Sequence, residues 1–376
     1  MSSGPIRHLY VHIPFCPKVC PYCSFYKEAS DRNKTQGFLD AVLAELDLRQ
    51  RSLELRPETI FFGGGTPSAL STAQLDYLLA GLRARLDLSQ LREWTLEMNP
   101  ATVSLEKASR LRQLGVNRIS MGVQSWDEGL LQVLGRVHNA AQAQRSYAIL
   151  RDAGFDNVNL DLMFAVPTQT RDQWSASLEK TIALQPEHIS AYCLTYEEDT
   201  AFFARFTKGE FTQDTSWDAD LFEDTMDRLS GAGYGQYEIS NYAREGRDCL
   251  HNLAYWLGAD YLGLGPSAFS TVGERRWQNV ADTSAYTGKI QAGVHAEAFS
   301  ESVPGDLRRS EQIAFALRTN RGVPREWLEP WSREVAEFER DGFFSGAEDR
   351  VYLTRRGKMV ADTLAQTFVS APEHAR

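Results

Sequence analysis

The segment LYVHIPFCPKVCPYC, residues 9–23, joins an apolar, strand-like run to three closely spaced cysteines. Cys16, Cys20 and Cys23 follow the pattern Cys-x3-Cys-x2-Cys, and thiolates bind iron–sulfur clusters and zinc alike. A structural zinc site takes four ligands, so zinc would need a further one, for which His12 is the nearest candidate. Three thiolates suit a [4Fe-4S] cluster that leaves one iron open for a small molecule. We therefore predict such a cluster, in preference to zinc or to three buried structural cysteines.

Strand-like and helix-like segments alternate through the first two thirds of the chain. Apolar runs that stop at glycine or proline are typical of buried parallel strands, and apolar residues at helical spacing predict helices between them. The predicted strands are residues 9–13, 59–64, 94–100, 118–124, 158–167 and 188–196. The predicted helices include 35–53, 75–86, 105–115, 140–153 and 171–184. These six βα units predict an α/β fold with a parallel sheet, either open or closed into a barrel.

Polar side chains gather toward the C-terminal ends of these predicted strands. Gly63–Pro67 ends the second strand, Glu97 lies near the end of the third, Gln124 ends the fourth, and Asp161 lies on the fifth. In parallel α/β folds the working residues sit at this edge of the sheet. A purely structural role would not place polar groups so regularly, so we expect a ligand site there.

The pattern changes after about residue 210. A helix is predicted over 216–232, followed by a glycine-rich strand region. The stretch 305–370 reads as helices, a short hairpin and a last helix, an order typical of a small α+β, winged-helix-like unit. We therefore divide the chain into a core barrel at 1–240, a connecting region at 241–304 and a C-terminal winged-helix-like domain at 305–376.

Length and composition exclude several classes of protein. The chain has 376 residues, 43% of them hydrophobic, enough for a globular protein of two or three domains. A formal net charge of -10 argues against a nucleic-acid partner, because an acidic surface repels phosphate. No apolar run reaches the roughly 18 residues of a membrane span, and no signal-peptide stretch opens the chain. We expect a cytoplasmic protein with at most peripheral membrane contact. Five cysteines, an odd number, argue against a disulfide framework.

With Tyr22 before its third cysteine, the cysteine loop resembles the signature of the radical S-adenosylmethionine (SAM) superfamily. The resemblance implies an incomplete (β/α)6 barrel and a cluster whose open iron holds SAM. Without the resemblance, the glycines of the segment Gly63–Pro67 indicate only a tight turn. Each polar residue at a strand end then indicates only a helix cap or a solvated side chain. The residues that the resemblance assigns to SAM are Tyr10, Tyr22, Gly64, Gly65, Thr66, Glu97, Gln124, Arg136 and Asp161.

Within this superfamily, residues from about 7 to 365 resemble the oxygen-independent coproporphyrinogen III oxidases and their HemW relatives. The oxidases carry a further cysteine two residues after the third ligand, where this chain has Phe25. They also have a longer segment before the cluster. Both differences favour the HemW branch and count against coproporphyrinogen decarboxylation, which stays the alternative activity. Whether SAM is cleaved in turnover is left open.

The segment HNLAYW, residues 251–256, resembles the HNxxYW motif that the HemW family associates with heme. Histidine is a natural axial ligand of heme iron, and aromatic rings pack on a porphyrin face. On a helix, His251 and Tyr255 would share one face, and Trp256 would point about 100° further round. The residues assigned to heme are His251, Asn252, Tyr255 and Trp256. Without the resemblance, the segment also reads as a buried histidine with two core aromatics.

The HemW resemblance implies a heme chaperone, with heme as cargo beside the cluster and SAM. Its partners would be heme-acceptor proteins such as respiratory enzymes, and an electron donor such as flavodoxin or ferredoxin. A zinc-stabilised interaction protein, which would need no SAM site, is a third reading of the same cysteines.

Overall fold

The structure is a computed structural model that describes residues 4–347 and 349–369. Six parallel strands form its centre, each hydrogen-bonded to the next along the chain. This order confirms the predicted succession of βα units. The strands are β1 (Ile6–Ile13), β4 (Leu55–Gly64), β5 (Glu93–Met98), β6 (Arg118–Gln124), β7 (Val158–Phe164) and β8 (His188–Cys193).

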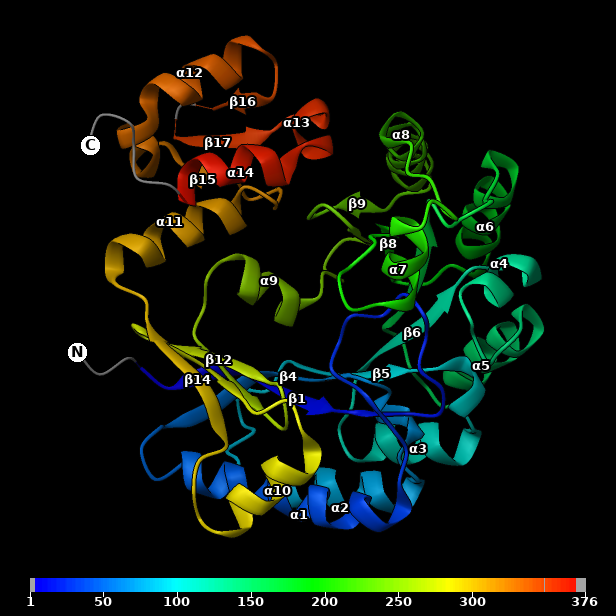
Figure 1. The fold of residues 1–376 in the computed structure, drawn as a ribbon, viewed down its shortest axis with the longest axis vertical. Coiled ribbons are helices and arrows are strands. Elements are labelled where there is room, and N and C mark those ends of the chain that lie inside the picture. The colour runs from blue at the N-terminus through cyan, green and yellow to red at the C-terminus, as the bar shows by residue number, and fades with distance from the viewer. Residues whose placement is uncertain (1–3, 348, 370–376) are drawn as a thin grey trace.

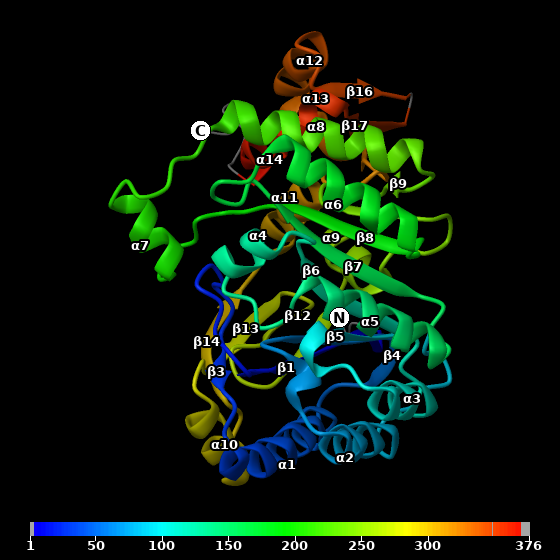
Figure 2. The ribbon, with the colours of Figure 1, turned by 90° about the vertical axis from the view of Figure 1, so that its right-hand side faces the viewer.

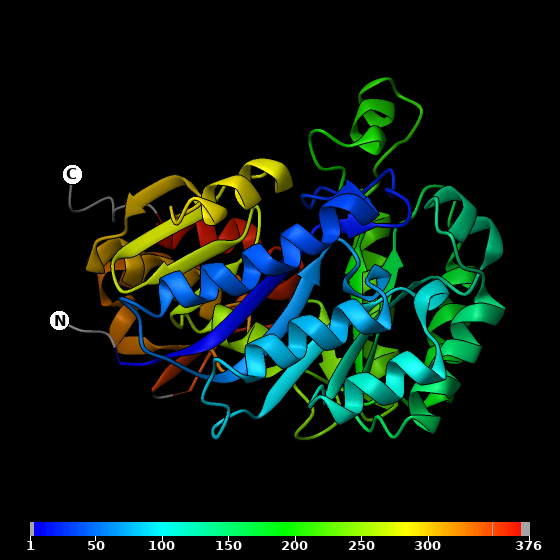
Figure 3. The same ribbon diagram turned by 90° about the horizontal axis from the view of Figure 1, so that it is seen from below.

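Helices connect these strands and cover the convex, outer side of the sheet (Figure 1). Seen from below, the first three connecting helices lie side by side across that face (Figure 3). Strand residues such as Val11, Ile60 and Leu96 are fully buried beneath them, because parallel strands are covered on both faces. The connecting helices are α1 (Arg32–Arg49), α2 (Thr72–Arg83), α3 (Leu105–Gln113), α5 (Ala140–Asp152) and α6 (Arg171–Leu184).

Further strands extend the parallel sheet at both edges. Strand β1 also pairs with β11, which leads into three antiparallel strands. At the other edge β8 pairs with β10, and β10 with β9. Over the described residues the two ends of this twelve-stranded sheet do not pair, so the barrel is incomplete, as predicted. The added strands are β9 (Gly235–Gln236), β10 (Asn241–Ala243), β11 (Tyr261–Leu264), β12 (Phe269–Val272), β13 (Arg275–Asn279) and β14 (Glu297–Ser302).

Shorter elements complete the main body. Helix α9 lies on the concave side, between the sheet and the C-terminal unit (Figure 1), and α7 projects away from the body (Figure 2). A two-stranded pair, β2 and β3, brackets the cysteine loop. The elements are β2 (Phe15–Cys16), β3 (Glu28–Ala29), η1 (Pro67–Ala69), η2 (Pro100–Thr102), α4 (Glu128–Val133), α7 (Ala201–Thr207), α8 (Thr215–Gly231), α9 (Leu250–Trp256) and α10 (Thr283–Gln291).

The C-terminal unit has its own apolar core and a small antiparallel sheet of order β15-β17-β16. Its helices, hairpin and final helices follow the order predicted as winged-helix-like, and the short strand after the first helix was not predicted. Its elements are α11 (Gly305–Ala316), β15 (Val323–Pro324), η3 (Arg325–Trp331), α12 (Ser332–Arg340), β16 (Phe344–Gly346), β17 (Arg350–Leu353), α13 (Arg355–Met359) and α14 (Ala361–Val369).

The division into domains at 1–240, 241–304 and 305–376 stays a prediction, and residues 1–3 and 370–376 of its outer parts lie outside the described residues. Residues 261–302 add strands to the main sheet, although the sequence suggested only a connecting region. In the part of the chain that the structure describes, no helix is both long enough and apolar enough to cross a membrane.

Candidate functional site

The three cysteines and eight of the nine residues assigned to SAM line one cavity of about 170 Å3. The cavity lies at the C-terminal ends of the parallel strands, where the sequence predicted a ligand site. Segments far apart in the sequence therefore meet at one place. The residues are Cys16, Cys20, Tyr22, Cys23, Gly64, Gly65, Thr66, Glu97, Gln124, Arg136 and Asp161.

Polar and cationic side chains hold the cysteine loop at the mouth of this cavity. Nη1 of Arg136 lies 3.7 Å from Sγ of Cys20, and Oγ1 of Thr66 lies 3.5 Å from Sγ of Cys16. The ammonium group of Lys27 donates a hydrogen bond to a backbone carbonyl of the same loop. The sulfur atoms are thus surrounded by groups that stabilise negative charge.

These surroundings can be tested against the needs of a cluster. Burial raises the pKa of the Cys16 and Cys23 thiols, and the charge of Lys27 opposes this rise at Cys23. Cluster ligands are thiolates, whose charge needs cations or hydrogen-bond donors in a half-buried site. Arg136 and Lys27 meet that need, so the donor set fits a [4Fe-4S] cluster.

The glycine turn at the end of β4 packs closely against the chain that leads into the cysteine loop. Gly64 has a φ of +104°, and a Cβ there would lie 2.5 Å from the His12 ring. A Cβ on Gly65 would lie 2.6 Å from the carbonyl oxygen of Pro14. Packing alone therefore requires glycine at both positions. The same turn brings Thr66 and the backbone around it to the cavity wall.

Two carboxyl groups, Glu97 on β5 and Asp161 on β7, lie on the cavity wall. Burial, together with the nearby charge of Asp161, raises the pKa of Glu97 to about 8. Burial also raises the pKa of Asp161, although Nδ2 of Asn159 donates a 2.6 Å hydrogen bond to its Oδ1. Two enclosed acceptors of this kind suit hydroxyl or ammonium donors of a bound ligand.

Arg136 and Gln124 form another part of the wall. Nη2 of Arg136 donates to the carbonyl oxygen of Gly122 at 2.7 Å. Gln124 has a φ of +68°, a left-handed conformation that a non-glycine residue adopts at some cost. The hydroxyl of Tyr192 donates to Oε1 of Gln124 at 2.6 Å. Tyr192 also lines the cavity, and the sequence analysis missed it because a tyrosine inside an apolar strand carries no distinguishing signal.

Tyr10 is the one predicted SAM residue that does not line this cavity. Its ring packs on Phe61 with centroids 6.3 Å apart, and its hydroxyl lies 3.1 Å from Nδ1 of His12. A Cβ on Gly63 would lie 3.1 Å from the Tyr10 ring, so Tyr10 sits directly behind the turn. Its assignment to SAM stays a prediction.

The predicted heme motif forms helix α9, whose N-terminus is capped by the carboxylate of Glu93. The backbone N–H of His251 donates to Oε1 of Glu93 at 3.1 Å. Only 1% of His251 is exposed, and both of its ring nitrogens are engaged. Nδ1 lies 2.7 Å from Oγ1 of Thr59, and Nε2 lies 3.0 Å from the hydroxyl of Tyr255.

Burial lowers the pKa of His251 to about 3, and its ring stacks on Phe61 with centroids 5.1 Å apart. These features match a satisfied buried histidine, the alternative that the sequence left open. The assignment of His251 to heme stays a prediction, and His251 is not among the residues that line the cavity next to the rest of its motif.

The other three motif residues, Asn252, Tyr255 and Trp256, line a second cavity of about 680 Å3. This lies within the roughly 300–1,000 Å3 of small-molecule and cofactor pockets. Six aromatic side chains of the described residues line it, and its cationic side chains are paired, for example Arg308 with Asp260 at 2.9 Å. The further residues are Phe25, Gly258, Ala259, Tyr261, Phe269, Thr271, Arg276, Arg308, Glu311, Gln312 and Phe315.

Phe25 lines both cavities. Its side chain is 67% exposed, more than that of any other large hydrophobic residue described as exposed. The cysteine-lined cavity and the aromatic cavity are therefore neighbours, with a single aromatic ring shared between their walls.

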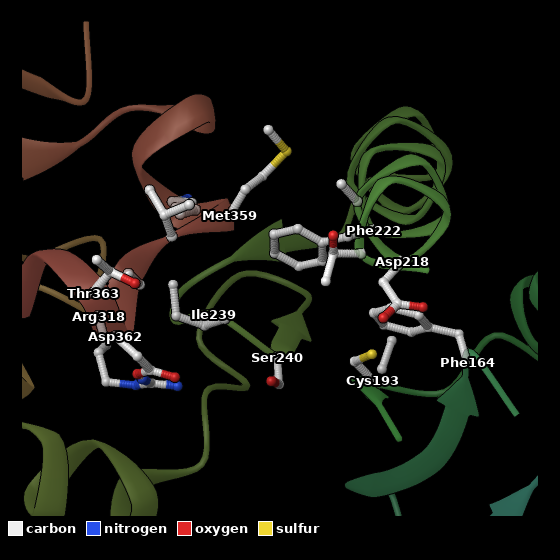
Figure 4. Close-up of a pocket in the computed structure, with 16 residues that line it drawn as sticks. Phe164, Cys193, Asp218, Phe222, Ile239, Ser240, Arg318, Met359, Asp362 and Thr363 are labelled. Atoms are coloured by element: carbon white, nitrogen blue, oxygen red, sulfur yellow. The ribbon is translucent and has the colours of Figure 1, made fainter. Parts of the chain in front are cut away.

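A third cavity, of about 400 Å3, lies where β8 and α8 face the C-terminal unit (Figure 4). Its lining mixes apolar side chains such as Phe222 and Met359 with charged ones such as Asp218 and Asp362. No residue predicted for the cluster, SAM or heme lines it. Arg318, on its wall, also lies over the Trp256 ring at 4.9 Å, and so connects the C-terminal unit to α9.

Comparisons with known proteins agree with this geometry. Residues 10–181 match the family model of the radical SAM superfamily. The heme chaperone HemW of Bacillus subtilis is 32% identical to this chain, over 97% of this chain and 99% of its own length. That of Haemophilus influenzae is 40% identical, over 98% of this chain and its full length.

Two further proteins extend the comparison. A mouse mitochondrial protein, radical S-adenosyl methionine domain-containing protein 1, is 38% identical, over 100% of this chain and 90% of its own length. The solved structure of coproporphyrinogen III oxidase (HemN) from Escherichia coli, a radical SAM enzyme, superposes with a TM-score of 0.84 at 24% identity. It covers 97% of this chain and 91% of HemN, which shows that the fold is shared.

Proposed function

Because the chain belongs to the HemW family of radical SAM proteins, we propose that it is a heme chaperone, which binds heme and passes it to acceptor proteins. The observation that carries the proposal is the cavity of about 680 Å3 lined by Asn252, Tyr255 and Trp256. Its aromatic walls suit a flat apolar ligand, because rings stack on a porphyrin face. Arg276 and Arg308 in its lining supply cations for the carboxylate groups of such a ligand.

In this proposal Cys16, Cys20 and Cys23 hold a [4Fe-4S] cluster, and the surrounding cavity holds SAM. When bound, the cluster supplies one-electron chemistry toward the SAM sulfonium. Glu97 and Asp161 would accept hydrogen bonds from the ribose hydroxyls, and the Arg136 guanidinium would pair with the methionine carboxylate. The Gly64–Gly65 turn lets the backbone approach the methionine amino group.

The position of Phe25 relates the cluster to the heme cavity. A heme held against Tyr255 and Trp256 would be separated from the cysteine loop by the side chain of Phe25. The cluster and SAM would then influence the release of heme, since anything that moves this loop also moves one wall of the heme cavity.

Oxidative decarboxylation of coproporphyrinogen III is the second candidate, favoured only by the fold shared with HemN. Phe25 stands where the oxidases, by the resemblance, carry a cysteine. We propose respiratory enzymes as acceptors, flavodoxin or ferredoxin as electron donor, a cytoplasmic location with at most peripheral membrane contact, and no nucleic-acid partner.

A heme-transfer assay tests the chaperone proposal. The anaerobically reconstituted protein is loaded with one equivalent of heme and then mixed with a respiratory heme protein from which the heme has been removed. Transfer of the Soret absorbance to the acceptor, without protoporphyrinogen formation from coproporphyrinogen III in a parallel assay, supports it. Multiple turnovers in the parallel assay would favour the oxidase instead.

A further inference from the structure

The cavity assigned to heme has few side chains able to bind iron. Histidine, cysteine, methionine and tyrosine are the usual protein ligands of heme iron. Among the described residues that line this cavity, only the tyrosines Tyr255 and Tyr261 belong to that set. The carboxylate of Glu311 is already paired with Arg276, Nη1 to Oε1 at 3.0 Å.

The two tyrosines differ in what their hydroxyl groups do. The hydroxyl of Tyr255 is directed to His251, 3.0 Å from Nε2, on a histidine that is itself enclosed. The part of the chain that the structure describes offers the hydroxyl of Tyr261 no hydrogen-bond partner. Of the two tyrosines in this cavity, Tyr261 is therefore the one whose hydroxyl oxygen is not already hydrogen-bonded within the described residues.

The register of β11 explains why Tyr261 faces the cavity. Leu262 and Leu264 are fully buried in the main core, and neighbouring side chains on a strand point to opposite faces. Tyr261 therefore points to the concave face, as does Thr271, its partner on β12, which lines the same cavity. The rings of Tyr261 and Tyr255 lie with centroids 4.4 Å apart.

We propose that the phenol oxygen of Tyr261 is the protein ligand to ferric heme iron in this cavity, and that His251 acts indirectly, by holding Tyr255 against Tyr261. The proposal rests on the proposed function. On binding, the Tyr261 oxygen donates an electron pair to Fe3+ and its proton leaves to water; no electron is transferred. His251 is then a positioning residue, since its two ring nitrogens bind Thr59 and Tyr255.

The test adds ferric heme to the anaerobically reconstituted protein and records resonance Raman and electron paramagnetic resonance spectra of the complex. The wild-type complex should show high-spin ferric iron with an iron–phenolate vibration. Tyr261→Phe, which removes one oxygen atom, should lose that vibration and bind heme at least tenfold more weakly. Tyr77→Phe, at an exposed tyrosine outside this cavity, is the matched control and should keep both the vibration and the wild-type affinity.

A second variant tests the proposal by the appearance of a new heme spectrum instead of the loss of the iron–phenolate vibration. Tyr261→His places an imidazole at the same position and should replace the phenolate spectrum with that of a nitrogen-ligated heme. An iron–phenolate vibration that persists in Tyr261→Phe, or one that is absent from the wild type, would overturn the proposal. A wild-type protein that binds no heme at all would instead refute the proposed function itself.

Discussion

Nε2 of His251 lies 3.0 Å from the hydroxyl of Tyr255, so two residues of the predicted heme motif bind each other inside the protein. With Nδ1 of the same ring bonded to Thr59, the imidazole is satisfied. The contact turns the Tyr255 hydroxyl inward and leaves its ring as part of the cavity wall. The motif therefore builds the wall, and our proposal assigns iron ligation to Tyr261, a residue outside the motif.

Replacing this buried histidine should change how stability depends on pH. The folded pKa of about 3 lies below the roughly 6.5 of an unfolded histidine. As the pH falls below 6.5, the unfolded chain binds the proton first, and the free energy of unfolding decreases. Between pH 7.5 and pH 6.0, His251 should lower the free energy of unfolding by about 0.8 kcal/mol. His251→Gln should lose that contribution in thermal unfolding at the two pH values.

The control is His295→Gln, at an exposed position, which should keep the wild-type difference between pH 7.5 and 6.0. An equal pH dependence in His251→Gln and the wild type would show that the imidazole is not buried in its neutral form.

The cysteine loop should be the part of the chain that holds iron. Replacing Cys16, Cys20 or Cys23 by alanine should abolish uptake of about four irons per chain, because each thiolate holds one corner of the cluster. Iron analysis after anaerobic reconstitution measures this. Cys193→Ala is the matched control, since Cys193 lies on the third cavity. A tetrahedral zinc ion in the wild-type protein, without iron uptake, would support the zinc alternative.

Glu97 should govern SAM binding in a pH-dependent way. Glu97→Gln should weaken binding by about 10- to 100-fold, the loss expected for a hydrogen bond to a charged group, with iron content unchanged. Because the pKa of Glu97 is about 8, its carboxylate form grows between pH 7 and 9, so wild-type affinity should rise over that range. Anaerobic calorimetry should show no such rise in the variant.

Phe25 should contribute to heme affinity without affecting the cluster. Phe25→Ala removes an apolar side chain from the heme cavity, and a partial loss of its roughly 1.5–3 kcal/mol burial energy weakens binding about tenfold. Heme titration and iron analysis of the same sample measure both effects. Phe299→Ala, at another exposed phenylalanine that is 45% exposed and outside the cavity, should bind heme as the wild type does.

Much of the fold could be predicted from the sequence, because apolar strand runs and amphipathic helices are local signals. The convergence of Glu97, Gln124 and Asp161 on one cavity followed from a general rule for parallel strands. The pairing of β11 with β1 could not be predicted, since it joins residues some 250 positions apart. Likewise, nothing local shows that His251 meets Thr59 and turns away from the cavity. Tyr261 was missed because its exposure depends on that same pairing.

The central claim, that heme binds in the aromatic cavity, is tested most directly by filling each of two cavities in turn with a tryptophan side chain. Ala259 lines the aromatic cavity, and Ala219 lines the third cavity, between α8 and the C-terminal unit. In a titration of reconstituted protein with heme, Ala259→Trp should abolish binding near one heme per chain, while Ala219→Trp should bind as the wild type does. Unchanged binding in Ala259→Trp, or loss of binding in Ala219→Trp alone, would contradict the account.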